Sequence, residues 1–226
     1  MNRLLALILV AALGLGCAKF PGGGGGTGAT RLTFRLILDG PINSNFVYIV
    51  AMRPTTEDPP TTPGPIPVVA PPWGNGFVEG GVTHFVRWDL SQSPHYLIYQ
   101  FQGIDLINYS ERGVPINFLE VEANGKEIRF EIELPQISAS EAEADTWRTL
   151  QVNFLTMDLV PQGSGGNKSW DALGNGNLPN EINEYVNIPL RTSGTYDNRR
   201  FQDVEPRGDN PDPALDIVDW SVEVRT

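Results

Sequence analysis

Alternation of apolar and polar residues predicts β-strands along most of the chain. Residues 31–38 (RLTFRLIL) place their apolar side chains on one face and their cationic and polar side chains on the other. A period of two is the pattern of a strand with one buried face. Further strands are predicted at residues 82–89, 96–102, 149–158 and 216–225. Residues 45–52 are apolar on both faces and predict a central strand.

Residues 116–134 (INFLEVEANGKEIRFEIEL) predict a β-hairpin. Asn124 and Gly125 at its centre suit a two-residue type I′ turn, because both central positions of that turn require a positive φ. Folding the segment there places Leu119 opposite Phe130 and gives the hairpin one apolar face. One short helical turn is predicted within residues 138–147, where Ser138 and Glu141 have the spacing of a capping box.

Long polar connections separate the predicted strands, at residues 53–76, 161–185 and 192–215. The first carries eight of the 19 prolines, which favour extended polyproline-like conformations and cannot lie inside a sheet. Together the patterns predict an all-β fold, an antiparallel β-sandwich of jelly-roll or immunoglobulin-like type with long loops and at most one short helix. Residues 31–226 are predicted to form a single β-sandwich domain.

The amino-terminal segment has the features of a secretory signal. Residues 1–16 contain one cation, Arg3, followed by an apolar run that is too short to span a bilayer, which takes about 20 residues. The sequence Gly14-Leu15-Gly16-Cys17 resembles the lipobox of bacterial lipoproteins, in which the cysteine is acylated, although the family usually has leucine where this chain has Gly14. The alternative is an ordinary secretory signal followed by a chance cysteine.

Cys17 is the only cysteine of the chain, so it cannot form an intrachain disulfide. Residues 17–30 read as a lipid-anchored, glycine-rich linker, and about 13 such residues hold a domain roughly 20 Å from its anchor. By the sorting rules of bacterial lipoproteins, Ala18 after the cysteine implies the outer membrane, with the domain on its periplasmic or surface face. The formal charge of −11 becomes one unit more negative when Arg3 is removed, and it excludes nucleic acid and anionic lipid headgroups as partners.

The order of elements resembles that of the DOMON and family-9 carbohydrate-binding-module group. The resemblance rests on residues 126–138 (KEIRFEIELPQIS), 149–158 (TLQVNFLTMD) and 216–224 (DIVDWSVEV). It implies a β-sandwich that binds sugars between tryptophans, binds haem, or serves as a receptor-like surface domain. Haem sites of the group use methionine and histidine, and the few such residues of this chain do not map onto a ligating pair.

Tryptophans are the leading candidates for a binding site. Trp73 and Trp170 lie in Gly- and Asn-rich loops, where the rings either pack back onto the sandwich or form a stacking platform for sugars. Asn175 is a candidate donor and acceptor for sugar hydroxyls beside Trp170. Trp88 and Trp220 lie within predicted strands and are expected in the core, and Trp147 is expected to be a packing anchor.

Three acidic residues of one loop form a candidate calcium site: Asp209, Asp212 and Asp216. Clustered carboxylates suit a hard cation, but Pro211 and Pro213 restrict how these side chains can converge. The alternative is a solvated acidic loop. No other cofactor is predicted.

Signatures of common enzymes are absent from the sequence. It contains no His-Glu-x-x-His helix, no Gly-x-Ser-x-Gly elbow and no phosphate-binding Gly-Lys-Ser/Thr loop. We therefore expect a non-catalytic, membrane-anchored envelope lipoprotein that binds a glycan or another ligand. The first alternative is a structural or assembly component of the envelope, whose partner is another envelope protein. The abundant carboxylates leave a two-carboxylate glycan hydrolase open as a weaker alternative.

Overall fold

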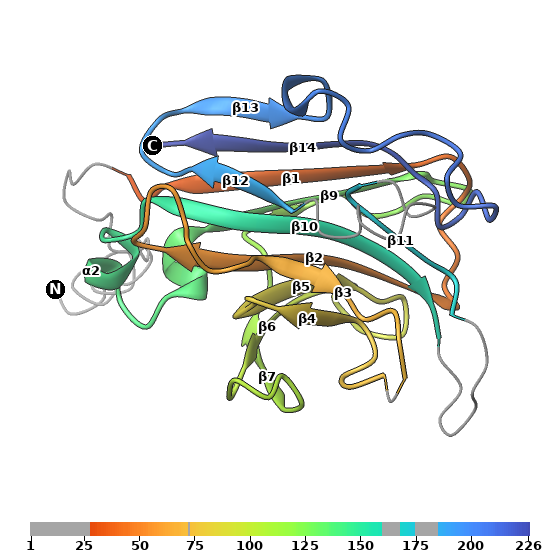
Figure 1. Ribbon diagram of the computed structural model, residues 1–226, viewed down its shortest axis with the longest axis horizontal. Coiled ribbons are helices and arrows are strands. Elements are labelled where there is room, and N and C mark those ends of the chain that lie inside the picture. Colours follow the sequence, from red (N-terminus) through yellow and green to blue (C-terminus); the bar gives the residue numbers. More distant parts are fainter. Residues whose placement is uncertain (1–27, 72, 160–167, 175–184) are drawn as a thin grey trace, which may run out of the picture.

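The computed structural model describes residues 28–71, 73–159, 168–174 and 185–226. Two antiparallel sheets face each other (Figure 1), which confirms the predicted all-β sandwich. The five-stranded sheet has the order β13 (Gly194–Asp197), β14 (Ile217–Arg225), β1 (Arg31–Leu38), β9 (Glu127–Glu133) and β8 (Asn117–Phe118).

The seven-stranded sheet has the order β11 (Trp170–Ala172), β10 (Thr149–Asp158), β2 (Phe46–Thr55), β5 (His84–Trp88), β6 (Tyr96–Phe101) and β7 (Tyr109–Gly113), and β12 (Val186–Pro189) also pairs with β10. A separate ribbon pairs β3 (Pro65–Pro67) with β4 (Val78–Gly80). The helical segments are short: η1 (Leu134–Ile137), α2 (Glu141–Ala144) and η2 (Arg199–Phe201).

One hydrophobic cluster fills the space between the two sheets. β1 alternates as predicted, because four of its apolar side chains are buried in this cluster: Leu32, Phe34, Leu36 and Leu38. The cluster takes residues from the first strand to the last, since β14 contributes Trp220, Val222 and Val224. Trp88 and Trp147 are also buried there, which confirms that these tryptophans serve packing.

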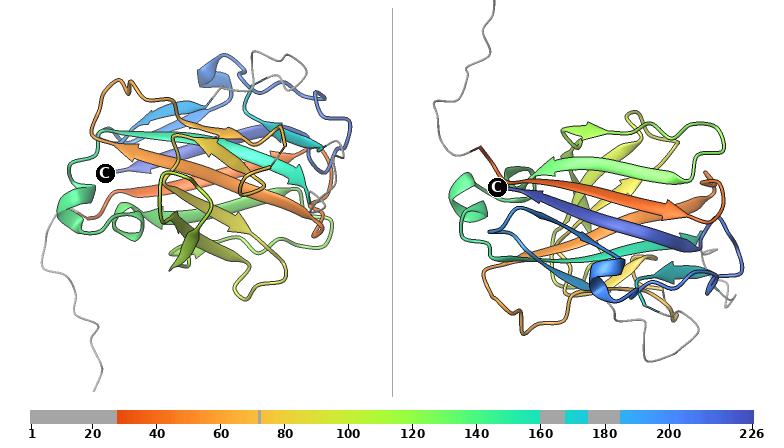
Figure 2. Two further views of the ribbon diagram at one scale, coloured as in Figure 1. Left: turned by 60° about the horizontal axis from the view of Figure 1, so that its bottom comes forward. Right: turned by 90° about the horizontal axis from the view of Figure 1, so that it is seen from above.

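A second hydrophobic cluster lies on the outer face of the seven-stranded sheet, beneath the β3–β4 ribbon and its flanking loops (Figures 1 and 2). This cluster explains why β2 is apolar on both faces: Tyr48 and Val50 point between the sheets, whereas Ile49 and Ala51 point outward into the second cluster. The sandwich therefore has a third layer on one side only.

Polar side chains of β10 fix the proline-rich segment in this third layer. The Gln151 side chain donates a hydrogen bond to the Thr62 carbonyl (3.1 Å), and the Asn153 side chain donates one to the Pro65 carbonyl (3.0 Å). The prediction that prolines of this segment lie outside any sheet was wrong for β3. Gly64 and Val68 make the cross-ribbon backbone hydrogen bonds, so Pro65 and Pro67 occupy the alternate positions, where no donor is needed.

The predicted hairpin forms with a different register and a longer connection. Phe118 lies opposite Phe130, one residue away from the predicted partner Leu119. A slip of one residue moves every side chain to the other face. Phe118 packs on the buried ring of Tyr96, with ring centroids 5.1 Å apart, and Leu119 is left exposed. Asn124 alone of the two central residues has a positive φ.

The predicted helical turn is present as α2. Its N-cap is Ser140, two residues after the predicted cap Ser138. The Ser140 side chain, rather than that of Ser138, accepts a hydrogen bond from the backbone N–H of Glu143 (3.1 Å). Ser138 is buried and donates instead to the carbonyl of Ser140 (2.8 Å). Capping at the N-terminus needs an oxygen facing the third helical N–H, and Ser140 has that position.

In the part of the chain that the structure describes, no helix has the length and apolar character needed to cross a membrane. The predicted signal segment, Cys17 and most of the glycine-rich linker lie outside the described residues.

Candidate functional site

Three carboxylates meet where β11 and β14 adjoin. Asp171, Asp209 and Asp216 each offer an oxygen within 4.8 Å of the others. Asp171 belongs to β11, at the edge of the seven-stranded sheet, whereas Asp209 and Asp216 belong to the loop that leads into β14 of the five-stranded sheet. Together with Glu205 of the same loop, these residues are called the acidic cluster below.

Backbone pairing fixes the position of Asp171. Its partner across the ladder is Thr156 of β10, while the flanking Trp170 and Ala172 pack on the outer, second cluster. Because side chains alternate along a strand, Asp171 points inward between the sheets. Its carboxylate accepts hydrogen bonds from the backbone N–H of Ile217 (2.7 Å) and of Ala172 (2.9 Å).

The loop of residues 205–216 wraps around the carboxylate of Asp216. That carboxylate accepts hydrogen bonds from the backbone N–H of Gly208 (3.0 Å) and of Asn210 (3.2 Å). Gly208 has φ of +78°, a conformation that glycine adopts without steric cost. The Asn210 side chain donates a hydrogen bond to the Trp170 carbonyl (2.7 Å). These contacts fasten the loop to β11.

Glu205 is buried beside the three aspartates. The side chain of Asn198 holds its backbone, accepting from the Glu205 N–H (2.9 Å) and donating to the Glu205 carbonyl (2.8 Å). Both carboxylate oxygens of Glu205 are inaccessible to water and have no hydrogen-bond partner of normal geometry in the described structure. Burial first, and then the charges of the three aspartates, raise the pKa of Glu205 far above its usual range; the Gly174 N–H has a smaller, opposite effect.

The pKa of Asp171 is also raised. Burial is the main cause and the charge of Asp209 the second, and together with Asp216 they raise the pKa of Asp171 to about 8 against the effect of its two N–H donors. None of the ion pairs between described residues includes Asp171, Glu205 or Asp216. Like charges that are buried together disfavour ionisation, and no ion pair among the described residues offsets that effect at Asp171, Glu205 or Asp216.

The sequence grouped Asp209, Asp212 and Asp216, and the structure brings together only the first and the last of these. The carboxylate of Asp212 instead accepts a hydrogen bond from the Ala214 N–H (2.9 Å), within its own turn. Asp171 and Glu205 were not predicted. Asp171 stands between two apolar residues in the segment Trp-Asp-Ala. This alternation is typical of a short strand and could have indicated that Asp171 points to the opposite face from its neighbours.

The loops that carry the two candidate tryptophans meet in the third layer. Lys168, two residues before Trp170, places its ammonium 5.7 Å from the ring centroid of Trp73. Lys168 also donates hydrogen bonds to the carbonyls of Val68 (2.9 Å) and Gly76 (2.6 Å). Its burial lowers the pKa of Lys168 to about 8, against the opposing charge of Asp158.

Both rings are half-buried, and Trp170 packs back onto the sandwich. Trp73, with φ of +69°, is half-buried, and its indole N–H is inaccessible to water without a hydrogen-bond partner. Trp170 is half-buried against the second cluster. Asn175 lies outside the described residues.

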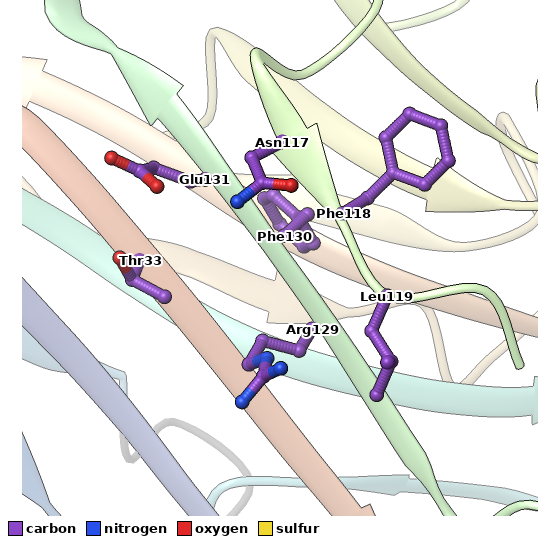
Figure 3. Close-up of a pocket in the computed structure, with 7 residues that line it drawn as sticks. All are labelled: Thr33, Asn117, Phe118, Leu119, Arg129, Phe130 and Glu131. Carbon is purple, nitrogen blue, oxygen red and sulfur yellow. The ribbon is translucent and has the colours of Figure 1, made fainter.

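A shallow hollow on the outer face of the five-stranded sheet is a weaker candidate. Figure 3 shows the residues that line it, beside β8. Its volume is about 80 Å³, whereas ligand pockets measure roughly 300–1,000 Å³. Seven residues line it: Thr33, Asn117, Phe118, Leu119, Arg129, Phe130 and Glu131. Its size suits a few water molecules, and it carries no functional assignment.

Comparison with models of known protein families, with curated proteins and with solved structures found no match. The similarity to the DOMON and family-9 group therefore stays a prediction, and only the sandwich fold that it implied is confirmed.

Proposed function

We propose that this chain is an envelope lipoprotein, anchored by acyl chains on Cys17, whose sandwich binds a ligand non-catalytically on its third layer. A glycan is the first class of ligand to test. The observation that carries the proposal is the meeting of two loops that are about a hundred residues apart in sequence, through the contacts of Lys168 with Trp73, Val68 and Gly76. Aromatic rings beside polar groups suit the alternating C–H and hydroxyl faces of a sugar.

Burial of the acidic cluster supports a role without catalysis. A glycosidase needs two carboxyl groups that reach the scissile bond from both sides. Asp171 and Glu205 are each only 1% exposed, so no substrate can approach them in this conformation.

Binding is tested by titrating a panel of bacterial and plant glycans while the tryptophan fluorescence of the protein is recorded. We expect a saturable change with at least one glycan, which Trp170→Ala and Trp73→Ala each weaken at least tenfold. Leu90→Ala is the matched control, because Leu90 is an exposed apolar residue of a different loop, and it should bind like the wild type. A flat response across the panel would favour the alternative role as a structural or assembly component of the envelope.

The anchor is tested separately. Mass spectrometry of the native protein should find acyl groups on Cys17, and Cys17→Ser should move the protein from the membrane fraction to the soluble fraction. Two acyl chains give stable anchoring where a single chain is marginal. An unmodified thiol on a protein that washes off in buffer would refute the lipid anchor and leave the binding proposal standing.

A further inference from the structure

The acidic cluster has the donor set and the spacing of a site for a hard divalent cation. Ligand oxygens that share one Ca²⁺ at 2.3–2.6 Å are separated from each other by at most about 5 Å. Asp171, Asp209 and Asp216 meet that limit, each with an oxygen within 4.8 Å of the others.

Glu205 is a second, independent observation that points to a cation at this place. It is 1% exposed, and neither carboxylate oxygen accepts a hydrogen bond of normal geometry in the described structure. A buried carboxylate without a partner costs several kcal/mol unless it is neutralised or binds a cation. The charges of Asp171, Asp209 and Asp216 act on Glu205, so its side chain lies close to the place where the three aspartates meet.

Hydrogen bonds hold two of the carboxylates in place for binding. Asp216 is fixed by the N–H groups of Gly208 and Asn210, and Asp171 by those of Ile217 and Ala172. A carboxylate oxygen has two lone pairs, so each of these side chains keeps acceptor sites for an ion. Outer contacts that orient ligands in this way are characteristic of metal sites.

The chemistry of the donors selects the ion. The cluster consists of carboxylates alone, which favours Ca²⁺ or Mg²⁺ over Zn²⁺. Mg²⁺ keeps several waters and is held by one or two carboxylates, whereas Ca²⁺ takes six to eight oxygens in flexible geometry. Four acidic side chains, three of them almost fully buried, fit the larger ion.

We propose that Asp171, Glu205, Asp209 and Asp216 bind one calcium ion, which joins β11 of one sheet to the loop entering β14 of the other. The ion neutralises the buried charges and fastens the edge strand β11, whose first residue, Trp170, packs against the second cluster. This inference does not depend on glycan binding, because the ion lies on the inner side of β11 and the tryptophan on its outer side.

Calorimetry and thermal unfolding of the purified protein test the site, after dialysis against EGTA and then against metal-free buffer. We expect binding of one Ca²⁺ per chain. At a hundredfold excess over Kd the melting temperature should rise by about 5–10 °C. MgCl₂ at the same concentration should raise it much less. Equal melting temperatures in CaCl₂ and EGTA, with no heat of binding, would overturn the proposal.

Two variants of the same loop separate a cation site from an acidic loop. Asp209→Asn should abolish calcium binding and the rise in melting temperature that CaCl₂ produces. Asp212→Asn is the matched control, since Asp212 lies three residues away and outside the cluster, and it should keep the wild-type response to calcium. If both variants respond to calcium like the wild type, the proposal is wrong. Glycan binding that survives Asp209→Asn would leave the proposed function intact.

Discussion

The two outer faces of the sandwich are built in opposite ways. The five-stranded sheet presents a network of charged side chains. Arg31 and Arg35 pair with carboxylates of neighbouring strands, whereas Arg129 and Arg225 pair with carboxylates of their own strands, and Arg225 also reaches Glu131 of β9. The seven-stranded sheet presents apolar side chains that the proline-rich segment and the β3–β4 ribbon cover. Figure 2 shows the β3–β4 ribbon packed against the outer side of the seven-stranded sheet. We call the two surfaces the open face and the covered face.

The two faces differ in how much they contribute to the free energy of unfolding and in which of them carries the loops. Exposed ion pairs contribute about 0–1 kcal/mol each, whereas a buried aromatic side chain contributes several kcal/mol. The covered face therefore stabilises the fold, and it also brings Trp73 and Lys168 together. The charged side chains of the open face contact water and add little to the free energy of unfolding.

The largest expected effect lies in the covered face. Phe85 is fully buried and stacks on Tyr99, with ring centroids 4.9 Å apart. Phe85→Ala should lower the free energy of unfolding by about 3–5 kcal/mol, as measured in urea, because it removes a large buried ring. Arg129→Ala on the open face is the control and should cost less than about 1 kcal/mol. A loss below about 1 kcal/mol for Phe85→Ala would mean that the third layer is not a core.

The fold was predictable where one physical rule decided the outcome. Alternation located β1 and β14, since the buried face of each repeats every two residues. The hairpin register was not predictable from its turn, because the packing of Phe118 on Tyr96 outweighed the Asn124-Gly125 signal. Short strands such as β7 and β12 were not predicted, because a strand of so few residues is too short to show a clear period of two.

The candidate site was less predictable than the fold, because it is assembled from distant segments. Asp209 and Asp216 were found from their local spacing, but Asp171 and Glu205 join them only through the pairing of β11 with β10 and the contacts of Asn198. Trp73 likewise meets Lys168 only in the folded chain, because the two residues are 95 positions apart in the sequence. Local patterns identify residue types, and long-range pairing decides which of them meet.

Stability that is lost at acid pH should come from the interior of the sandwich rather than from the open face. His84 is buried between the sheets, and burial together with the charge of Arg112 lowers its pKa from 6.5 to about 4. Between these values the unfolded chain binds a proton that the folded chain does not, so stability is lost as the pH falls from 6.5 to 4. The loss should be about 3 kcal/mol.

Urea unfolding at several pH values checks this effect. Asp171 and Glu205, whose raised pKa values act in the opposite direction over this range, are present in both proteins. Relative to its own stability at pH 7, His84→Gln should therefore lose about 3 kcal/mol less than the wild type between pH 6.5 and 4. Arg35→Gln on the open face should leave the shape of the profile unchanged. If Arg35→Gln flattened the profile and His84→Gln did not, the acid response would belong to the open face.

A smaller effect should follow from loosening the cover itself. The Asn153 side chain donates to the Pro65 carbonyl and accepts from the Leu173 N–H (3.1 Å), both in buried surroundings. Asn153→Ala should cost about 2 kcal/mol, because it leaves two buried backbone groups without partners. Hydrogen exchange of the Leu173 amide should accelerate in the same variant. Ser221→Ala on the open face should change neither quantity, and equal behaviour of the two variants would contradict the assignment of Asn153.

The smallest expected effect lies on the open face and gives the comparison its strictest test. Arg35 contacts Glu127 at 3.2 Å and Asp219 at 3.5 Å, and its side chain is 37% exposed. Arg35→Ala should cost less than about 1 kcal/mol in urea unfolding, and 1 M NaCl should reduce that cost, since salt screens exposed charges. A double-mutant cycle with Glu127→Ala should give a coupling energy below about 1 kcal/mol. A coupling energy above about 2 kcal/mol that salt does not change would require the pair to be shielded from water. The open face would then be covered by a partner in solution, and the two faces of the sandwich would differ only in what covers them.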